Sequence, residues 1–280
     1  MNRISVGFVG ISVLLIAGPL SIAKAADMSP APVYKAPPPP PPVYSWTGFY
    51  IGGNAGGAWG NFDPSTSVVF SPTGYFATTS TPAITTAGTQ SISPTGFTGG
   101  FEAGYNFQAS NIVYGLEGDI ESFRLSGNST SGLVTYPCCA PTGFTVTSNA
   151  STSWLATARG RLGFAANNWL FFATGGAAFT NLSGNFAFSD TFATAAEASS
   201  FSGTKTGWTA GGGVEAGLWG NWSVKAEYLY VDFGTVTGTS TNLTAFTPPI
   251  AFPTNIFTHS IDLKASIARV GINYRFGGPY

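Results

Sequence analysis

The chain has 280 residues and a formal net charge of −1, so it lacks the basic surface of a nucleic-acid-binding protein. Charged residues make up only 8%, whereas aromatic residues reach 15% and there are 37 glycines. Soluble surfaces carry far more charge, and disordered chains carry few aromatic residues. The composition therefore favours a protein whose outside faces hydrocarbon.

Residues 1–25 have the pattern of an export signal. Arg3 gives a positive start, an apolar stretch follows over residues 6–22, and the A-x-A pattern ends at Ala25. We expect cleavage between Ala25 and Ala26. A membrane-anchoring helix is the alternative, but Gly18 and Pro19 interrupt an apolar core that is already short.

Residues 26–45 are rich in proline and include a run of six prolines at 37–42. Such a segment favours extended polyproline II and forms no packed core. We interpret it as a periplasmic linker, with a docking peptide for a proline-binding partner as the alternative.

Residues 46–280 have the alternation of β-strands. Segments with strand chemistry occupy residues 46–59, 96–108, 112–123, 153–164, 169–179, 207–219, 222–233 and 260–276. Short connections alternate with connections longer than about 20 residues, as in bacterial outer-membrane barrels. The predicted fold is all-β, a membrane-spanning, eight-stranded, antiparallel up-and-down barrel with long extracellular loops and both termini in the periplasm. No stretch after residue 25 is long and apolar enough for a membrane helix.

The last segment shows the alternation best, since residues 268, 270, 272, 274 and 276 are apolar and Arg269 and Arg275 lie on the other face. Charges in the other segments also oppose the apolar face. A barrel of eight strands leaves room for little more than side chains, so opposite charges inside it must pair. The predicted lumen network contains Glu102, Glu117, Asp119, Glu121, Arg159, Arg161, Glu215, Lys225, Glu227, Arg269 and Arg275. The pair expected first joins Glu117 or Asp119 to Arg159 or Arg161.

Two other arrangements would also alternate. An open sheet with a solvated charged face would expose a very large apolar patch, which a soluble monomer avoids. A two-sheet sandwich could bury that patch and remains the alternative fold. The fifth segment, residues 169–179, alternates poorly, and we assign no faces to it.

All seven tryptophans fall at or near segment ends, where amphipathic rings favour a membrane interface. They are expected to form two aromatic girdles, made by Trp46, Trp59, Trp154, Trp169, Trp208, Trp219 and Trp222.

Four stretches resemble the alphaproteobacterial outer-membrane immunogenic proteins, which belong with the OmpA-like barrels of the porin family: W-T-G-F-Y-I-G-G-N-A-G (46–56), G-W-T-A-G-G-G-V-E (207–215), W-S-V-K-A-E-Y-L-Y-V-D (222–232) and R-V-G-I-N-Y-R-F (269–276). The resemblance implies an outer-membrane location among lipid and lipopolysaccharide. It also implies periplasmic chaperones and a barrel-assembly machinery that reads a terminal aromatic residue, here Phe276 or Tyr280.

We expect a structural or narrow-pore protein with antigenic surface loops; the alternative is an adhesion module that binds a host-surface ligand through its four long loops. No cofactor, metal or enzymatic activity is expected. His259 adjoins Ser260 and precedes Asp262, but neighbouring strand residues point to opposite faces, so His259 is expected to be a loop histidine. Cys138 and Cys139 are adjacent, which fits disulfide geometry badly, and are expected to be ordinary loop cysteines.

Overall fold

The computed structural model describes residues 44–277. The predicted export signal with Ala25 and Ala26, the linker up to residue 43, and Tyr280 lie outside these residues. Among the residues described, no helix is long and apolar enough to cross a membrane.

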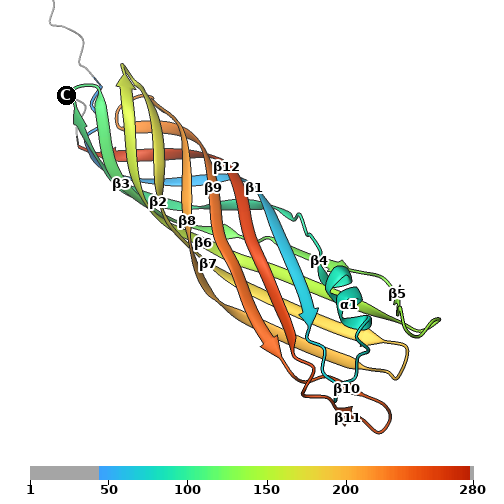
Figure 1. The fold of residues 1–280 in the computed structure, drawn as a ribbon. Coiled ribbons are helices and arrows are strands. Elements are labelled where there is room, and N and C mark those ends of the chain that lie inside the picture. The colour runs from blue at the N-terminus through green and yellow to red at the C-terminus, as the bar shows by residue number, and fades with distance from the viewer. Residues whose placement is uncertain (1–43, 278–280) are drawn as a thin grey trace, which may run out of the picture. The chain divides into compact units, whose positions relative to one another are not determined.

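The main body is an antiparallel ring of long strands (Figure 1). These strands are β1 (Gly48–Val68), β2 (Thr95–Ala109), β3 (Ile112–Phe123), β6 (Gly143–Ala166), β7 (Trp169–Asp190), β8 (Ala196–Gly217), β9 (Trp222–Ser240) and β12 (Phe257–Phe276). Each pairs with the next, and β12 pairs with β1, so the sheet closes on itself. A sandwich is therefore excluded.

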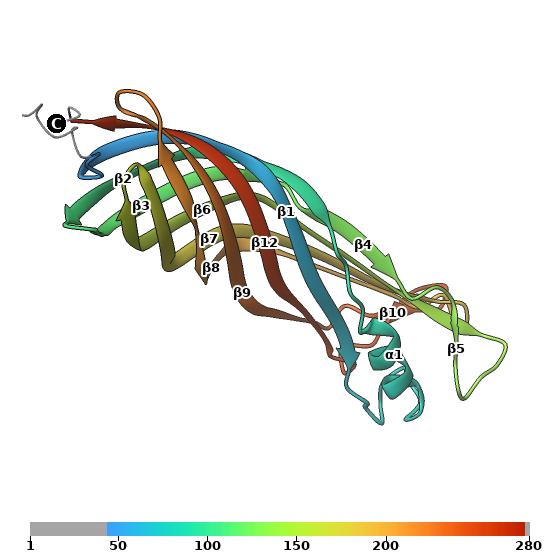
Figure 2. The ribbon, with the colours of Figure 1, turned by 90° about the horizontal axis from the view of Figure 1, so that it is seen from above.

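The short elements gather at one end of the ring, which we call the loop end (Figure 2). They are α1 (Ser80–Gly88), β4 (Ser126–Thr130), β5 (Val134–Thr135), β10 (Thr244–Ala245) and β11 (Ile250–Ala251). The opposite end, the turn end, has the tight connections β2–β3, β6–β7 and β8–β9. Ser110, Asn167 and Gly220 adopt positive φ in these three turns, as residues in tight hairpin turns often must.

Strand structure extends well into segments whose composition predicts loops. β1 continues past Trp59 to Val68, and only residues 191–195 separate β7 from β8. The segment Asn181–Asp190 explains the difference, because Leu182, Phe186 and Phe188 point inward and are buried. Asn181, Ser183, Asn185 and Ser189 lie on the opposite, outer face, so the alternation has the opposite sense to that of a membrane-spanning strand.

This reversal of polarity is clearest along β12. Its inward side chains are apolar over residues 257–267, apart from His259, whereas its outward side chains there include Thr258, Asp262 and Lys264. Over residues 268–276 the outward side chains are apolar and the inward ones are polar or charged. A tilted membrane-crossing strand needs about 9–11 residues. The turn-end half of the barrel therefore has the surface that hydrocarbon requires, and the loop-end half has the surface that water requires.

The interior has four layers. At the turn end, Trp46, Val113, Ala165, Leu170 and Phe172 form a small apolar cluster. The charged lumen comes next. An apolar cluster containing Phe62, Phe123, Leu229 and Leu263 fills the following section. A last cluster at the loop end includes Phe144, Phe188, Phe257 and Ile84 of α1.

One part of the wall is not paired. β8 and β9 share hydrogen-bonded register only from Trp208 opposite Asp232 to Gly217 opposite Ser223. Beyond Trp208, β8 pairs with β7 alone, apart from one contact between Ala196 and Thr244 of β10. We call the boundary between residues 196–207 and 233–240 the seam. Asn242 Nδ2 donates to the Ala198 carbonyl at 2.6 Å, and Phe201 packs on the apolar cluster beneath.

Candidate functional site in the lumen and at the loop end

The charged lumen is built by inward positions of six strands. Because successive strand side chains alternate between faces, Glu117, Asp119 and Glu121 of β3 all point inward, as do Arg159 and Arg161 of β6. The pairing of β3 with β6 sets Glu117 directly opposite Arg159. All these side chains are buried.

Arg159 is the centre of the network. Its guanidinium lies 2.5 Å from Glu117 and 2.7 Å from Asp119 on the neighbouring strand, and 2.7 Å from Glu227 on β9. Its Nε donates to Thr157 Oγ1 at 2.9 Å. A buried guanidinium is tolerated only with such complete pairing, so Arg159 ties β3, β6 and β9 together across the lumen.

Lys225 neutralises a group of three carboxylates. Glu102, Glu117 and Glu227 each place an oxygen within 4.8 Å of the others. Lys225 Nζ lies 2.6 Å from Glu102, 3.1 Å from Glu117 and 3.6 Å from Glu227. The ammonium group thus takes the place that a metal cation would need.

Two further arginines complete the network. Arg269 lies 3.2 Å from Asp119, 3.0 Å from Glu121 and 2.8 Å from Glu227. Arg161 pairs with Glu215, and its Cζ lies 3.8 Å from the centroid of the Phe172 ring. The structure therefore brings together all the residues of the predicted network except Arg275.

The prediction that Arg275 belongs to the lumen network is wrong. It lies at the turn end with its Cζ 4.7 Å from the centroid of the Tyr44 ring. No ion pair within 4.0 Å involves it among the residues that the structure describes. The alternation of β12 gives its direction correctly, but its position near the strand end carries it past the carboxylates into contact with an aromatic ring.

The structure also corrects the predicted position of Trp46. The prediction of a girdle position is wrong for this residue, which is 2% exposed and packs with Val113 and Leu170 inside the turn end. Its backbone N–H donates to Gln108 Oε1 at 2.7 Å. It precedes β1, so the chain turns it into the lumen. Five of the other six rings lie on the outer face, with Trp154 half-buried and Trp59, Trp169, Trp208 and Trp222 exposed. Trp219 is exposed in the β8–β9 turn.

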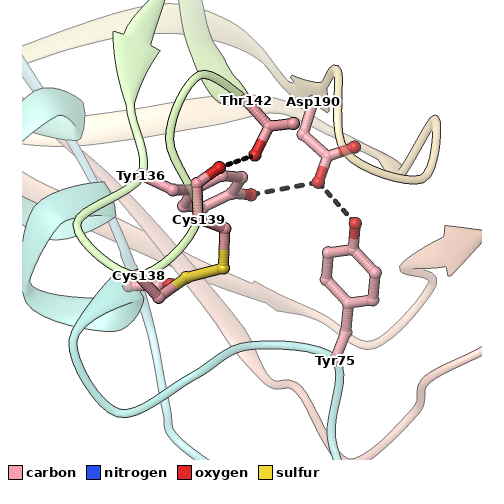
Figure 3. The surroundings of a disulfide bond; sticks show 7 residues. Tyr75, Tyr136, Cys138, Cys139, Thr142 and Asp190 are labelled. Atoms are coloured by element: carbon pink, nitrogen blue, oxygen red, sulfur yellow. Dashed lines mark hydrogen bonds between the residues drawn. A yellow bond between two sulfur atoms is a disulfide. The ribbon is translucent and has the colours of Figure 1, made fainter.

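The loop end is organised by Asp190. Its Oδ2 accepts from Tyr75 Oη at 2.5 Å and from Tyr136 Oη at 3.1 Å (Figure 3). Its Oδ1 accepts from the Ala195 N–H at 2.7 Å. Burial raises the pKa of both phenols, and the hydrogen bond to Asp190 and its negative charge raise it further. Three loops are thus joined at one carboxylate.

A disulfide joins Cys138 and Cys139 beside these tyrosines (Figure 3). The expectation of two unlinked loop cysteines is wrong, because the two adjacent side chains point toward each other and their sulfurs are bonded. The Thr142 N–H and hydroxyl both donate to the Cys139 carbonyl, at 3.1 and 2.5 Å, which holds a turn over residues 139–142. Apart from the adjacency of the two cysteines, no sequence pattern indicates this conformation.

His259 is not a loop histidine, because β12 begins at Phe257. It is buried beneath the loop end, where Nδ1 lies 2.9 Å from Thr66 Oγ1 and Nε2 lies 3.2 Å from Glu197 Oε1. Its ring stacks on Phe186 at 4.5 Å. Ser260 points to the other face and contacts Ser65 Oγ at 2.7 Å, so the two residues form no catalytic pair.

A closed antiparallel barrel with an apolar belt outside and charges inside has the construction of a transmembrane β-barrel. A family model described as "Outer membrane protein beta-barrel domain" matches residues 20–276. The chain belongs to this family and is an outer-membrane protein.

Its relatives include outer-membrane immunogenic proteins. The chain is 33% identical over 243 residues to the "31 kDa outer-membrane immunogenic protein" of Brucella melitensis, covering 85% of this chain and 88% of the relative. It is 29% identical over 213 residues to the "25 kDa outer-membrane immunogenic protein" of Brucella abortus, covering 76% and 78%. Neisserial surface protein A aligns with a TM-score of 0.34 at 14% identity over 82% of this chain and 98% of that structure.

Proposed function

We propose that the protein is a closed, structural outer-membrane barrel. Its loop end, with the connections over residues 69–94, 125–142, 191–195 and 241–256, forms a folded head outside the membrane. The observation that supports this proposal is the apolar cluster directly beyond the charged lumen. Phe62 and Phe123 are fully buried there, as are Leu229, Leu263 and Ile267. They come from β1, β3, β9 and β12, so the cluster fills the barrel from opposite sides.

A hydrated ion would have to cross this cluster without water. Transfer of an ion into an apolar medium carries a large desolvation cost unless a counter-charge accompanies it. The carboxylates of the lumen are already engaged by Arg159, Arg161, Lys225 and Arg269. Closure at this cluster, rather than a narrow pore, therefore fits the interior.

Single-channel recording in planar bilayers tests this proposal. The purified protein should give no discrete steps, while a reference porin in the same bilayers shows that channels are detected. A heat-modifiable gel shift must show that the barrel is folded and inserted. Discrete steps whose size changes in Arg159→Gln and Arg161→Gln would establish a conducting lumen and would contradict closure.

We propose that Phe276 contributes to recognition by the barrel-assembly machinery. It is the last residue of β12 and points outward, with its ring centroid 5.7 Å from Phe49 and 5.1 Å from Tyr274. Phe276→Ala should lower the amount of folded barrel in the outer membrane of cells, whereas Tyr280→Ala should not. The reverse result would assign the signal to Tyr280.

A second candidate function is recognition of a surface ligand by the head. Rings from two other loops surround Tyr75, with centroids at 6.4 Å for Phe192, 6.2 Å for Phe246 and 5.4 Å for Phe252. Phe192 and Phe246 are nevertheless 56% and 44% exposed. Exposed aromatic groups of this kind mark interaction sites.

The chemistry of the head restricts such a ligand. The connections over residues 69–94, 125–142, 191–195 and 241–256 contain no Asp, Glu, Lys or Arg. A ligand bound there should be neutral, and its binding should depend little on salt. Adhesion of cells with and without the protein tests this function, with Phe192→Ser as the variant. Binding that sulfated glycans abolish but neutral glycans leave unchanged would contradict a neutral ligand.

A further inference from the structure

We propose that the Cys138–Cys139 disulfide is a thiol–disulfide exchange site on the outer surface, which reacts with small external thiols. This inference does not depend on whether the barrel conducts. It needs only that the loop end faces the outside of the cell.

The two sulfurs differ in access. Cys138 is exposed, whereas Cys139 is half-buried and packs against the apolar cluster at the loop end. Because a disulfide sulfur carries no hydrogen, the Ser80 hydroxyl at 3.6 Å from Cys138 Sγ is the donor in their contact. Thiol exchange requires a nucleophile to reach one sulfur along the axis of the bond. Cys138 is the more exposed of the two residues, so its sulfur is the one that we expect an external thiol to reach.

A cavity of about 90 Å³ adjoins the disulfide and is lined by both cysteines, Tyr75, Tyr136, Phe192 and Ser80, among others. Half of the lining residues are aromatic, and the phenols of Tyr75 and Tyr136 are held on Asp190 (Figure 3). The cavity therefore offers apolar walls to the substituent of an attached thiol. Its size fits the part of an aliphatic thiol next to the sulfur, such as the cysteinyl side chain of glutathione, while the rest of a larger thiol stays outside.

The reaction begins when an external thiolate attacks Cys138 Sγ. A new S–S bond forms between the external sulfur and Cys138, the Cys138–Cys139 bond breaks, and its electron pair leaves on Cys139 Sγ, which takes a proton from water. A second external thiolate then attacks the sulfur of the first. The bond between that sulfur and Cys138 Sγ breaks, its electron pair leaves on Cys138 Sγ, which takes a proton from water, and the external pair leaves as its own disulfide, so the protein holds two thiols. The two cysteines are reduced by two electrons, and two external thiols are oxidised.

The adjacency of the two cysteines determines whether the mixed disulfide with the external thiol accumulates. In the mixed disulfide, the Cys139 thiol is the neighbouring residue and can attack Cys138 Sγ again, which expels the external thiol. The mixed disulfide should thus be short-lived in the wild type. It should persist in Cys139→Ser, where no neighbouring thiol can displace it.

The first experiment measures reduction under native conditions. Protein purified from outer membranes is incubated with reduced glutathione, trapped with a maleimide and weighed intact by mass spectrometry. We expect two maleimides on the native protein and none without glutathione. Labelling that requires denaturation would overturn the proposal, and so would two labels without any reductant, since the disulfide would then not exist.

The location of the disulfide is tested on intact cells with a membrane-impermeant maleimide. If the purified protein is labelled but the intact cells are not, the assignment to the outer surface is wrong.

The second experiment assigns the attacked sulfur. Cys139→Ser and Cys138→Ser each leave one thiol, and each is treated with oxidised glutathione after a heat-modifiable gel shift has shown that the barrel is folded. Because exchange follows access, the Cys138 thiol should form the adduct roughly tenfold faster than the Cys139 thiol. Equal rates, or a faster Cys139, would overturn the assignment to Cys138. If either variant fails to fold, a second comparison replaces this one. The rate at which glutathione reduces the disulfide is then measured in the wild type and in Phe192→Ala. An unchanged rate after the cavity wall is removed would exclude the cavity as part of the site.

Discussion

Lys225 Nζ lies 2.6 Å from Glu102 Oε1, although the two residues belong to β9 and β2, which are separated by β12 and β1 in the ring. This ion pair therefore crosses the lumen. Lys225→Met leaves Glu102, Glu117 and Glu227 close together without their shared cation. Removal of one partner from a buried pair costs about 3–5 kcal/mol, so the free energy of unfolding should fall by that amount. Urea titration of the protein folded in lipid vesicles measures it.

Lys264→Met is the matched control for that variant. Lys264 also pairs with a carboxylate, Asp262 at 2.6 Å, but on the outer face of β12 in contact with water. Exposed pairs contribute little, so its urea midpoint should stay near that of the wild type. Equal losses in both variants would show that the position across the lumen is not what makes Lys225 important.

Trp46→Ala should weaken the turn end. Trp46 fills the space between Val113 and Leu170, and truncation of a buried tryptophan costs about 3–5 kcal/mol. Trp219→Ala is the control because Trp219 is 74% exposed in the β8–β9 turn. Thermal unfolding followed by gel mobility compares the two. A Trp219→Ala variant that is less stable than Trp46→Ala would contradict the buried position of Trp46 and favour its place in a girdle.

The polarity reversal along β12 predicts a position-dependent effect of charge. Val270 points outward in the turn-end half and is 61% exposed. Arginine on the lipid face of a barrel costs about 2–4 kcal/mol near the midplane, so Val270→Arg should slow folding into vesicles and lower stability. Thr258→Arg, outward on the same strand beyond the reversal, should fold as the wild type does. Similar defects in both would move the membrane boundary towards the loop end.

The tyrosines at Asp190 predict loss of stability at high pH. Burial and Asp190 raise the pKa of Tyr75 and Tyr136 above the value of about 10 for an unfolded tyrosine. The folded state therefore keeps protons that the unfolded state releases, and their stabilising contribution is complete below pH 10 and declines above it. Near-ultraviolet circular dichroism should show a lower melting temperature at pH 11 than at pH 9. In the double variant Tyr75→Phe, Tyr136→Phe this difference should shrink, and an unchanged difference would assign the effect to other groups.

The turn-end half of the barrel could be predicted from the sequence because its environment is unambiguous. Hydrocarbon outside and a narrow interior require strict alternation, so the sequence alone places the side chains of Arg159 and Glu117 in the lumen. Their pairing could be anticipated because β3 and β6 are consecutive long strands of an up-and-down barrel. What alternation cannot supply is distance along the lumen, which is why it groups Arg275 with the carboxylates although this residue lies beside Tyr44.

The loop-end half could not be predicted in the same way. Its strands are Ser/Thr-rich outside and apolar inside, as in Asn181–Asp190, and the composition of that segment is typical of a loop. Leu182, Phe186 and Phe188 do alternate with polar residues, but in the opposite sense to the membrane-spanning strands. The convergence of Tyr75, Tyr136 and Asp190 joins residues more than fifty positions apart, and no local pattern encodes such contacts.

The seam between β8 and β9 gives the barrel an uneven resistance to opening. Residues 197–207 of β8 have a partner strand on one side only, and a few side-chain contacts, such as Glu197 with Ser240 and Asn242 with Ala198, hold the other side. Free energies of local opening are lowest where few backbone hydrogen bonds must break. Amide protons of this segment that point to the seam should exchange with deuterium long before those of residues 208–216, which are paired on both sides. A protease that attacks the native protein should therefore cut this arm of β8 first and leave the closed turn-end ring intact.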